Sequence, residues 1–342
     1  MAYILNDPTI FNIQDLIRED LLYLDDEYSS DKEDDEFEDL ILNPYDIYCL
    51  SVGNQTFEGD FLPVRWLIAN YRSVIRGVKL TQSAARVGNL KCLVYAHENR
   101  YEWDESTCYE AAENGHLDCL AYAHMQGYVW DEGTCVKAAA NGHLDCLRYA
   151  HMQGCEWDWR TCHEAAENGH LDCLVYAHEH GCEWDEITCA AAARYGHLDC
   201  LIYLHMQECP WDELTCRGAA ANGHLDCLTY AHENGCEWDV WTCQAAARYG
   251  HLDCLIYLHE QGCPWDVRTC TAAAENGHLD GLIYAHENGC PWNENICYDA
   301  ARYGCLDCLK YTLDEGCQWD SFYCKYVRDK EVLSYLKDKE MC

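Results

Sequence analysis

The feature that most constrains the fold of this 342-residue chain is a repeat with a period of 27 residues. Tryptophan and glycine each recur at this interval, and no insertion interrupts either series. Self-similarity at a fixed period predicts a repeat architecture in which each unit packs mainly against its neighbours. The tryptophans stand at positions 103, 130, 157, 184, 211, 238, 265, 292 and 319.

Each unit carries the signals of two short helices. Thr107 is an expected N-cap, and Glu110 completes a capping box with it. The first helix is expected to stop at Gly115, because glycine accepts a left-handed backbone at no steric cost. Asp118 then suits the amino end of a second helix, which is expected to end at Gly127.

One such unit cannot fold alone. Ordering each residue costs about 1–2 kcal/mol in backbone entropy, whereas burying a large apolar side chain returns only about 1.5–3 kcal/mol. Helices this short are also marginal in water. The units must therefore stack and bury the residues typified by Leu117, Leu120 and Trp130. We predict an all-α solenoid.

The pattern Ala-Ala-x-x-Gly-His-Leu-Asp-x-Leu, as in residues 111–120, resembles the ankyrin repeat. Two departures recur: Cys108 stands where ankyrin repeats usually have proline, and each unit is about six residues shorter. The resemblance implies an ankyrin-like helical-repeat solenoid with shortened hairpin fingers and helical caps. The repeats most resemble the ankyrin arrays of giant amoeba-infecting DNA viruses in their sequence pattern Gly-Cys-x-Trp-Asp-Glu-x-Thr-Cys.

The segments flanking the array differ from it in composition. Residues 1–24 contain an expected amphipathic helix, and residues 25–39 hold ten acidic residues, which predicts a disordered loop. Residues 40–79 are expected to form a helical N-terminal cap. Nine repeats are expected to fill residues 80–322, and a charged cap residues 323–342.

Residues 40–60 also resemble the second half of an F-box, which would make the chain a substrate-recognition adaptor of a ubiquitin ligase. The first half would be the 13–22 helix, on the far side of the acidic run. The alternative is a plain helical cap over the first repeat. The matching positions are Pro44, Asp46, Leu50, Asn54 and Phe57.

The formal net charge is −37. This sign argues against nucleic acid or an anionic membrane as the main partner, since both are polyanions. The first residues lack a basic region followed by an apolar core, and no apolar run approaches membrane-spanning length. We expect a soluble, intracellular monomer, and the viral resemblance implies the host cytoplasm.

The 27 cysteines fall mainly in three columns, typified by Cys162, Cys173 and Cys182. Equivalent cysteines of neighbouring repeats are expected to lie too far apart for disulfides, although pairs within a repeat remain geometrically possible. Zinc is an alternative, because histidine precedes cysteine by four residues in several units, as in His178 and Cys182. The columns also accept tyrosine and glycine, so we interpret them as reduced, buried packing residues and expect no metal or cofactor.

Two further columns have a structural and a functional interpretation. The column of His124 shares a stripe with leucines, which favours hydrogen-bonded interior histidines, with a proton-linked role in stability as the alternative. The column of Trp130 is interpreted as wedges in the core, rather than as an aromatic cage for a ligand.

The repeats also show a longer period of 54 residues. Arg194-Tyr195, Arg248-Tyr249 and Arg302-Tyr303 occur in alternate units, and Leu204 and Leu258 replace alanine in two of them. We interpret this as duplication of a two-unit block, with the larger tyrosine and leucine packed together in alternate layers.

The positions that vary between repeats lie on the first helix and just before the threonine. The ankyrin resemblance implies that they line the concave groove and the finger tips, and Trp, Tyr and Arg dominate interface energetics. The candidate partner-binding residues are Tyr109, Glu110, Glu113, Lys137, Trp159, His163, Glu164, Arg194, Arg217, Trp241, Gln244, Arg248, Tyr298 and Arg302.

The leading functional hypothesis is a non-enzymatic scaffold that binds a partner protein through the concave face, with a host protein as one candidate. A ubiquitin-ligase adaptor and a metal-binding repeat protein are the alternatives. The sequence contains no glycine-rich phosphate loop and no singular Ser/His/Asp set. Catalysis needs one unique constellation rather than nine copies, so we expect no enzyme.

Overall fold

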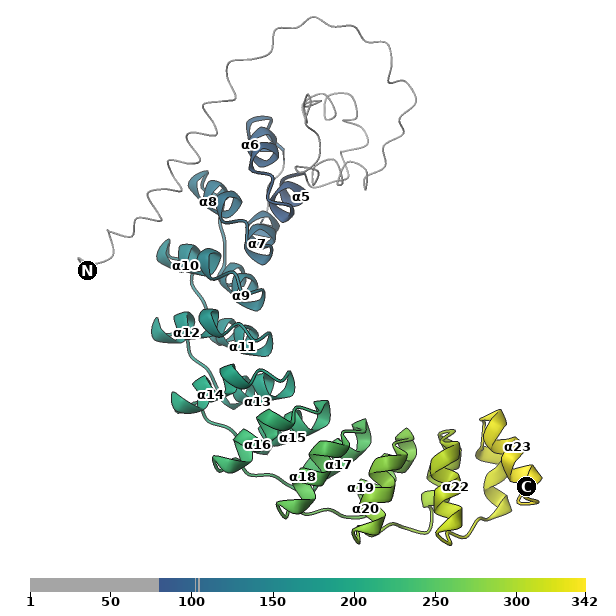
Figure 1. The fold of residues 1–342 in the computed structure, drawn as a ribbon. Helices are drawn as coiled ribbons and strands as arrows, with labels where there is room; N and C mark the ends of the chain where they lie inside the picture. The colour runs from purple at the N-terminus through teal and green to yellow at the C-terminus, as the bar shows by residue number, and fades with distance from the viewer. Residues whose placement is uncertain (1–79, 102, 104) are drawn as a thin grey trace, which may run out of the picture. The chain divides into compact units, whose positions relative to one another are not determined.

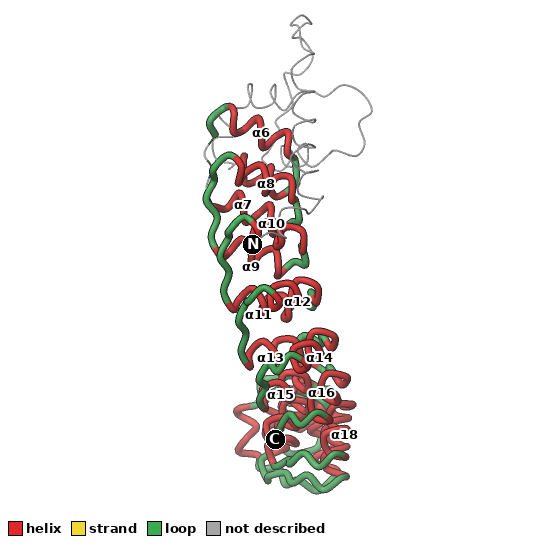
Figure 2. The backbone as a smooth tube through the Cα atoms, turned by 90° about the vertical axis from the view of Figure 1, so that its left-hand side faces the viewer, coloured by secondary structure: helices red, strands yellow, loops and turns green. Residues whose placement is uncertain are grey.

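The computed structural model describes residues 80–101, 103 and 105–342. These residues form nineteen α-helices and one 3-10 helix, and no described residue lies in a strand (Figure 2). The predicted all-α repeat array is therefore confirmed. The predictions for residues 1–24, 25–39 and 40–79, including the F-box resemblance, lie outside the described residues.

The chain forms two compact units, residues 1–161 and 162–342. In the first unit the described helices are α5 (Leu80–Arg86), α6 (Leu90–Glu98), α7 (Glu105–Glu113), α8 (Leu117–Met125), α9 (Glu132–Ala140), α10 (Leu144–Met152) and the start of α11 (Trp159–Glu167). The second unit continues with α12 (Leu171–Glu179), α13 (Glu186–Arg194), α14 (Leu198–Met206), α15 (Glu213–Asn222), α16 (Leu225–Glu233), α17 (Val240–Tyr249), α18 (Leu252–Glu260), α19 (Val267–Asn276), α20 (Leu279–Glu287), α21 (Ile296–Arg302), α22 (Leu306–Asp314), the 3-10 helix (Ser321–Tyr326) and α23 (Lys330–Asp338).

Within the second unit the helices form two rows (Figure 1). The first helices of the repeats, α13, α15, α17 and α19, pack side by side in one row, and the second helices α14, α16, α18 and α20 form the other. Each first helix also packs against the second helix of its own repeat. One row therefore presents a continuous face made of first helices only.

The first helices begin three residues earlier than the sequence predicted. In α15 the N-cap is Asp212, whose carboxylate accepts the backbone N–H of Leu214 at 2.9 Å, and Thr215 is a buried residue of the first turn. The equivalent aspartates Asp185, Asp239 and Asp266 cap α13, α17 and α19. The prediction that the Thr107 type is the N-cap was wrong. In α9, α13, α15, α17 and α19 the aspartate three residues before the threonine accepts a free N–H of the first turn.

The second helices follow the prediction. α8 begins at Leu117 with Asp118 in its first turn, and Gly115 and Gly127 adopt φ values of +73° and +82°. These left-handed conformations end the two helices of the repeat, as glycine allows.

The glycine between the two helices has a second role that its conformation alone does not explain. Gly223 has φ +78°, and a Cβ added there would lie 2.6 Å from Nδ1 of His251 in the next repeat. Nε2 of this histidine lies 3.1 Å from the carbonyl oxygen of Ala221. In most repeats this glycine and the next repeat's histidine thus form a contact between repeats, in which the ring fills the space beside the glycine, whereas Gly277 faces Cys305.

The core of each repeat consists of its Ala-Ala pair, one leucine and cysteines. In the repeat of α15 and α16, Leu228 and Cys216 are fully buried. Cys236 is also buried, and its thiol lies 3.1 Å from the carbonyl oxygen of Asp212, the helix cap of the same repeat. The buried cysteines therefore also hold the start of the first helix in place.

The cysteine prediction was right for most positions and wrong for four. Among the described residues, 22 cysteines are free thiols and all but Cys305 are buried. Two disulfides are present near the C-terminus, Cys297–Cys317 and Cys324–Cys342. Cys297 and Cys317 are 20 residues apart, the spacing of Cys216 and Cys236, so the bond lies within one repeat.

The tryptophan column does not form core wedges, contrary to the prediction. Trp265 is half-buried and stacks on His259 of its own repeat, with ring centroids 4.1 Å apart. Nδ1 of His259 lies 2.9 Å from the hydroxyl of Tyr284 in the next repeat. This His-Trp-Tyr ladder recurs along each unit, so the predicted hydrogen-bonded histidines are confirmed, although they are half-buried. Burial lowers the pKa of His124, His178 and His232.

The prediction that tyrosine and leucine pack together in alternate layers was also wrong. Leu204 and Leu258 are fully buried in α14 and α18, whereas Tyr195 and Tyr249 are 48% and 58% exposed. The tyrosines lie at the ends of α13 and α17, so the 54-residue period marks both the core and the surface.

At the C-terminus, α23 packs Val332 and Leu336 into the interior. The assignment of residues 323–342 as a cap remains a prediction. None of the described helices combines the length and apolar character needed to cross a membrane.

Candidate functional site: a groove across four first helices

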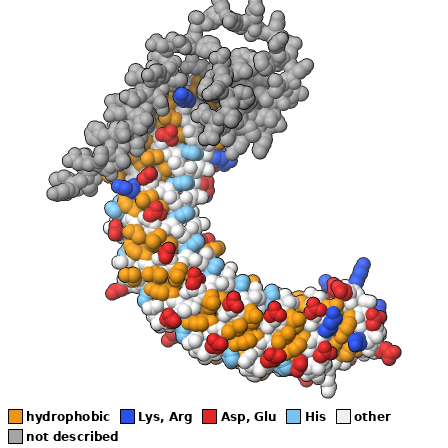
Figure 3. All heavy atoms as spheres, in the orientation of Figure 1, with side chains coloured by type: hydrophobic (Ala, Val, Ile, Leu, Met, Phe, Trp, Pro, Cys, Tyr) orange, Lys and Arg blue, Asp and Glu red, His pale blue; other side chains and the backbone are white. Residues whose placement is uncertain are grey.

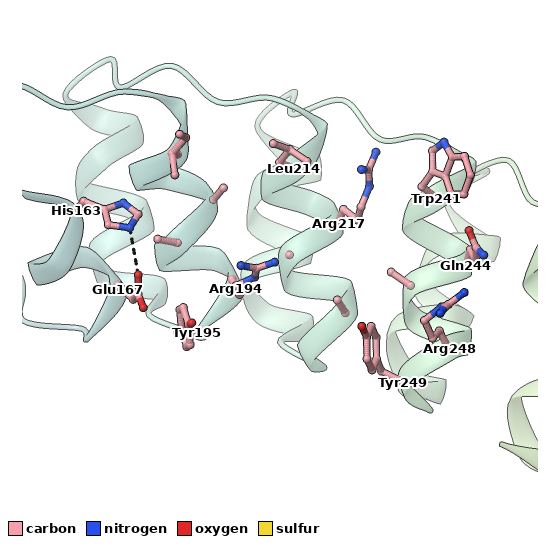
Figure 4. Close-up of a pocket in the computed structure, with 16 residues that line it drawn as sticks. His163, Glu167, Arg194, Tyr195, Leu214, Arg217, Trp241, Gln244, Arg248 and Tyr249 are labelled. Carbon is pink, nitrogen blue, oxygen red and sulfur yellow. Dashed lines mark ion pairs between the residues drawn. The ribbon is translucent and has the colours of Figure 1, made fainter. Parts of the chain in front are cut away.

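The second unit contains a groove of about 540 Å³ that runs across α11, α13, α15 and α17 (Figure 4). All four are first helices, so the groove lies on the face that the sequence predicted to vary. Its lining residues are His163, Glu167, Ile187, Ala190, Ala191, Arg194, Tyr195, Leu214, Arg217, Gly218, Ala221, Trp241, Gln244, Ala245, Arg248 and Tyr249.

Small residues line the groove between its larger side chains. Gly218 in the middle of α15 has no Cβ, and one placed there would lie 3.3 Å from the carbonyl oxygen of Ala190 and from Cβ of Arg194. α13 and α15 therefore approach closely at this point. Ala221 and Ala245 also leave space at the surface, so the groove is open along α13, α15 and α17.

One edge of the groove is apolar. Ile187, Leu214 and Trp241 are the second residues of α13, α15 and α17 and are 48%, 43% and 45% exposed. Figure 4 shows Leu214 and Trp241 on the same side of the groove. The guanidinium of Arg268 lies 4.0 Å from the centroid of the Trp241 ring. Exposed apolar side chains along one edge of a groove are typical of interaction sites.

The other edge is cationic and aromatic. Arg194 and Arg248 occupy the same register in α13 and α17, and Ala221 holds that register in α15 between them. Both arginines are exposed, and within the described part of the chain neither guanidinium has an ion-pair or hydrogen-bond partner. Tyr195 and Tyr249 follow them directly and lie beside them in Figure 4.

Two polar side-chain pairs involve residues that line the groove. Arg217 is paired with Asp239 at 2.7 Å, and its Nε is buried without an acceptor among the described residues. At the α11 end, Nε2 of His163 lies 3.1 Å from the carboxylate of Glu167 (Figure 4). With three arginines and one glutamate, the groove is positive in a chain whose net charge is −37.

Six of the predicted partner-binding residues come together in this groove. They are His163, Arg194, Arg217, Trp241, Gln244 and Arg248. Sequence reasoning missed Ile187, Leu214, Tyr195 and Tyr249. A signal for the first two existed, because they stand directly before the threonine, at a position already recognised as variable.

The other predicted residues lie outside the groove. Glu110 is buried, and its carboxylate accepts hydrogen bonds from Arg86 at 2.7 Å and Gln82 at 2.9 Å. These contacts, the arginine first, lower the pKa of Glu110. Its prediction as a free binding residue was therefore wrong, because a repeat stacked before it supplies its partners.

The remaining candidates are distributed over both units. Glu113 is paired with Lys137 at 2.8 Å. The Tyr298 ring lies against Tyr323 in a tilted arrangement with ring centroids 4.4 Å apart, and Arg302 lies over the Tyr298 ring. Tyr109 and Glu164 are half-buried, and Trp159 is exposed.

The histidine and cysteine of the proposed zinc spacing have different partners. Nδ1 of His178 lies 3.1 Å from the hydroxyl of Tyr203, whereas the Cys182 thiol lies 3.6 Å from the carbonyl oxygen of Glu183. Within the described residues, no three side chains among His, Cys, Asp and Glu are arranged to hold a metal ion.

Comparison with known proteins gives one family match, and it falls at the groove. Residues 162–205 match the family model for ankyrin repeats (many copies). The ankyrin resemblance is therefore confirmed for this segment, which includes α12 and α13. The crystal structure of the human ASB11 ankyrin repeat domain is similar at 18% identity and a TM-score of 0.41, over 46% of this chain and 84% of that chain. A comparison with curated proteins found no match.

Proposed function

We propose that the chain is a non-enzymatic scaffold that binds a partner protein through the groove of α11, α13, α15 and α17. The observation that carries this proposal is the row of exposed Ile187, Leu214 and Trp241 beside unpaired arginines. Trp, Tyr and Arg are the side chains that contribute most to protein interfaces. Ankyrin repeats, which residues 162–205 match, are generally modules of protein–protein interaction.

The resemblance of the repeats to arrays of giant amoeba-infecting viruses supports a host protein as the partner and the host cytoplasm as its location. The net charge of −37 favours a protein over nucleic acid or an anionic membrane. The chain acts as a monomer in this proposal. The ubiquitin-ligase adaptor remains a separate hypothesis, because its F-box-like residues lie outside the described residues.

Affinity capture with two matched variants tests the proposal. Leu214→Asp places a charge in the groove, whereas Val129→Asp changes an exposed valine of the first unit that is not in the groove. We expect quantitative mass spectrometry to show a protein that the native chain and the Val129 variant capture and that the Leu214 variant loses. If every captured protein binds the three chains equally, the groove is not the partner site.

A further inference from the structure

The two edges of the groove differ in chemistry and run parallel to each other. Ile187 and Arg194 lie seven residues apart on α13, as do Trp241 and Arg248 on α17. At 1.5 Å per residue, about 10 Å of helix separates the apolar edge from the cationic edge. A ligand that satisfies both must direct apolar groups to one side and acceptors to the other.

We propose that the groove binds an extended peptide segment in which apolar and acidic side chains alternate. This inference rests on the proposed function and names the chemistry of its partner. In an extended strand, successive side chains point to opposite sides. Such a segment lying across the helices presents its apolar side chains to Ile187, Leu214 and Trp241, and its carboxylates to Arg194 and Arg248.

The spacing along the groove suits an extended chain. Packed helices lie about 8–10 Å apart, so Arg194 and Arg248, two helices apart, are separated by about 16–20 Å. An extended chain rises about 3.3 Å per residue, so five to six residues cover this span. Ala221 occupies the equivalent position on α15, between the two arginines, and its small side chain leaves room for the peptide backbone.

The charges favour carboxylates over a nucleic acid strand. The groove has three arginines, of which Arg217 is already paired with Asp239. Arg194 and Arg248 are therefore the two free cations, enough for a few carboxylates. A nucleic acid carries a phosphate at every residue, and acidic side chains recur along the second unit (Figure 3). Those acids repel a polyanion with a charge on every residue more strongly than a peptide with a carboxylate on every second residue.

Binding of synthetic ten-residue peptides, measured by fluorescence anisotropy with the full chain, tests the inference. The probes are an alternating Glu-Leu peptide, an alternating Gln-Leu peptide, an alternating Glu-Ser peptide and decathymidylate. We expect the Glu-Leu peptide to bind at least tenfold more tightly than each of the others. Binding should also weaken as salt increases, because exposed charges are screened. Equal binding of the Gln-Leu peptide, or tighter binding of decathymidylate, would overturn the inference.

Two matched pairs of variants locate the binding. The double variant Arg194→Glu and Arg248→Glu should weaken Glu-Leu binding about tenfold or more, since it replaces attraction with repulsion. Arg302→Glu, at the same helix position outside the groove, should change it less than twofold. Trp241→Ala should weaken binding, whereas Trp159→Ala, which removes an equally exposed tryptophan outside the groove, should not. Equal effects within either pair would place binding elsewhere.

Residues 25–39 contain ten acidic side chains, so the same titration is repeated with those acids replaced by Asn and Gln. Tighter Glu-Leu binding by that variant supports the preference for acidic ligands, and absence of binding by both chains overturns it. The capture experiment separates this failure from that of the proposed function. A protein lost on Leu214→Asp but kept by the double arginine variant would leave the scaffold function standing and refute the acidic ligand.

Discussion

Nδ1 of His259 lies 2.9 Å from the hydroxyl of Tyr284, which belongs to the next repeat. The histidine ring also stacks on Trp265, and the tyrosine ring meets both rings edge-on. The same arrangement joins other successive repeats of the second unit. Each repeat is therefore tied to the next by one polar contact within an aromatic cluster.

Tyr284→Phe removes this hydrogen bond and leaves the ring packing in place. We expect the free energy of unfolding to fall by about 1 kcal/mol, the typical contribution of one such bond. Tyr249→Phe is the control, because its hydroxyl is part of an exposed side chain in the groove. Urea denaturation followed by circular dichroism measures both, and an equal loss in the two variants would show that the bond contributes nothing specific.

Gly223→Ala should destabilise the chain more than Gly235→Ala. Both glycines have left-handed φ values, +78° and +88°, so each substitution costs about 1–2 kcal/mol in backbone strain. A Cβ at Gly223 also collides with the His251 ring at 2.6 Å, whereas a Cβ at Gly235 meets nothing within 4 Å. The difference between their unfolding free energies measures the contact between repeats. Equal losses would mean that the ring moves aside freely.

Gly281→Ala should stabilise the chain by about 1 kcal/mol, because glycine inside a helix is unfavourable relative to alanine. Gly281 lies buried in α20, and an added Cβ would be 3.8 Å from Cδ2 of Leu255, an ordinary contact. Gly281→Cys, which restores the residue of other repeats, should also stabilise. Gly218→Ala is the control, since its Cβ would press on the Ala190 carbonyl oxygen at 3.3 Å, and it should gain less. A fall in thermal midpoint for both Gly281 variants would contradict the prediction.

Asp299→Asn should stabilise the chain at neutral pH but not at low pH. Burial raises the pKa of Asp299 to about 6, with a further contribution from Glu275, while Arg302 acts in the opposite direction. The unfolded carboxyl has a pKa of about 3.9. Between these values the native state holds a proton that the unfolded state has lost, so stability falls as pH rises from about 4 to 6.

Above pH 6 the cost is complete, and Asn removes it. We expect a gain on the order of 1–2 kcal/mol at pH 7.5 and none at pH 3.5. Chemical denaturation at several pH values measures the difference between the variant and the native chain. Asp314→Asn, at an exposed position of α22, is the control and should leave the free energy of unfolding unchanged at both pH values. A gain that is the same at both pH values would rule out titration of Asp299 as its cause.

The sequence was sufficient to predict the repeat, its two helices and the burial of most cysteines, because these depend on features that lie within 27 residues. The N-cap was misassigned since Asp and Thr, three residues apart, are both good caps. Which one caps the helix depends on the burial of the threonine, as at Thr215. Glu110 was misjudged because its partner Arg86 is 24 residues away in sequence and comes close only when the repeats stack.

Several residues of the groove were predicted from the sequence, but their arrangement into one groove was not. Arg194, Trp241 and Arg248 were recognised as variable positions, yet their convergence depends on the small residues between them. Gly218 and Ala221 carry no signal of interaction by themselves, and their importance follows from the larger side chains on either side. Half-exposure of the tryptophan column was also hidden, because an aromatic residue at a regular interval fits both a core and a surface stack.

The ladder of histidine and tyrosine has a direction, and its last rung shows how such an array can stop. Each histidine needs a tyrosine from the repeat that follows, and His286 finds Tyr311 in α22. At the next step the sequence has Leu313 in place of histidine and Asp338 in place of tyrosine. The ladder therefore ends at the pair of His286 and Tyr311. Because Leu313 has no polar group to pair, this repeat leaves no histidine without a tyrosine partner.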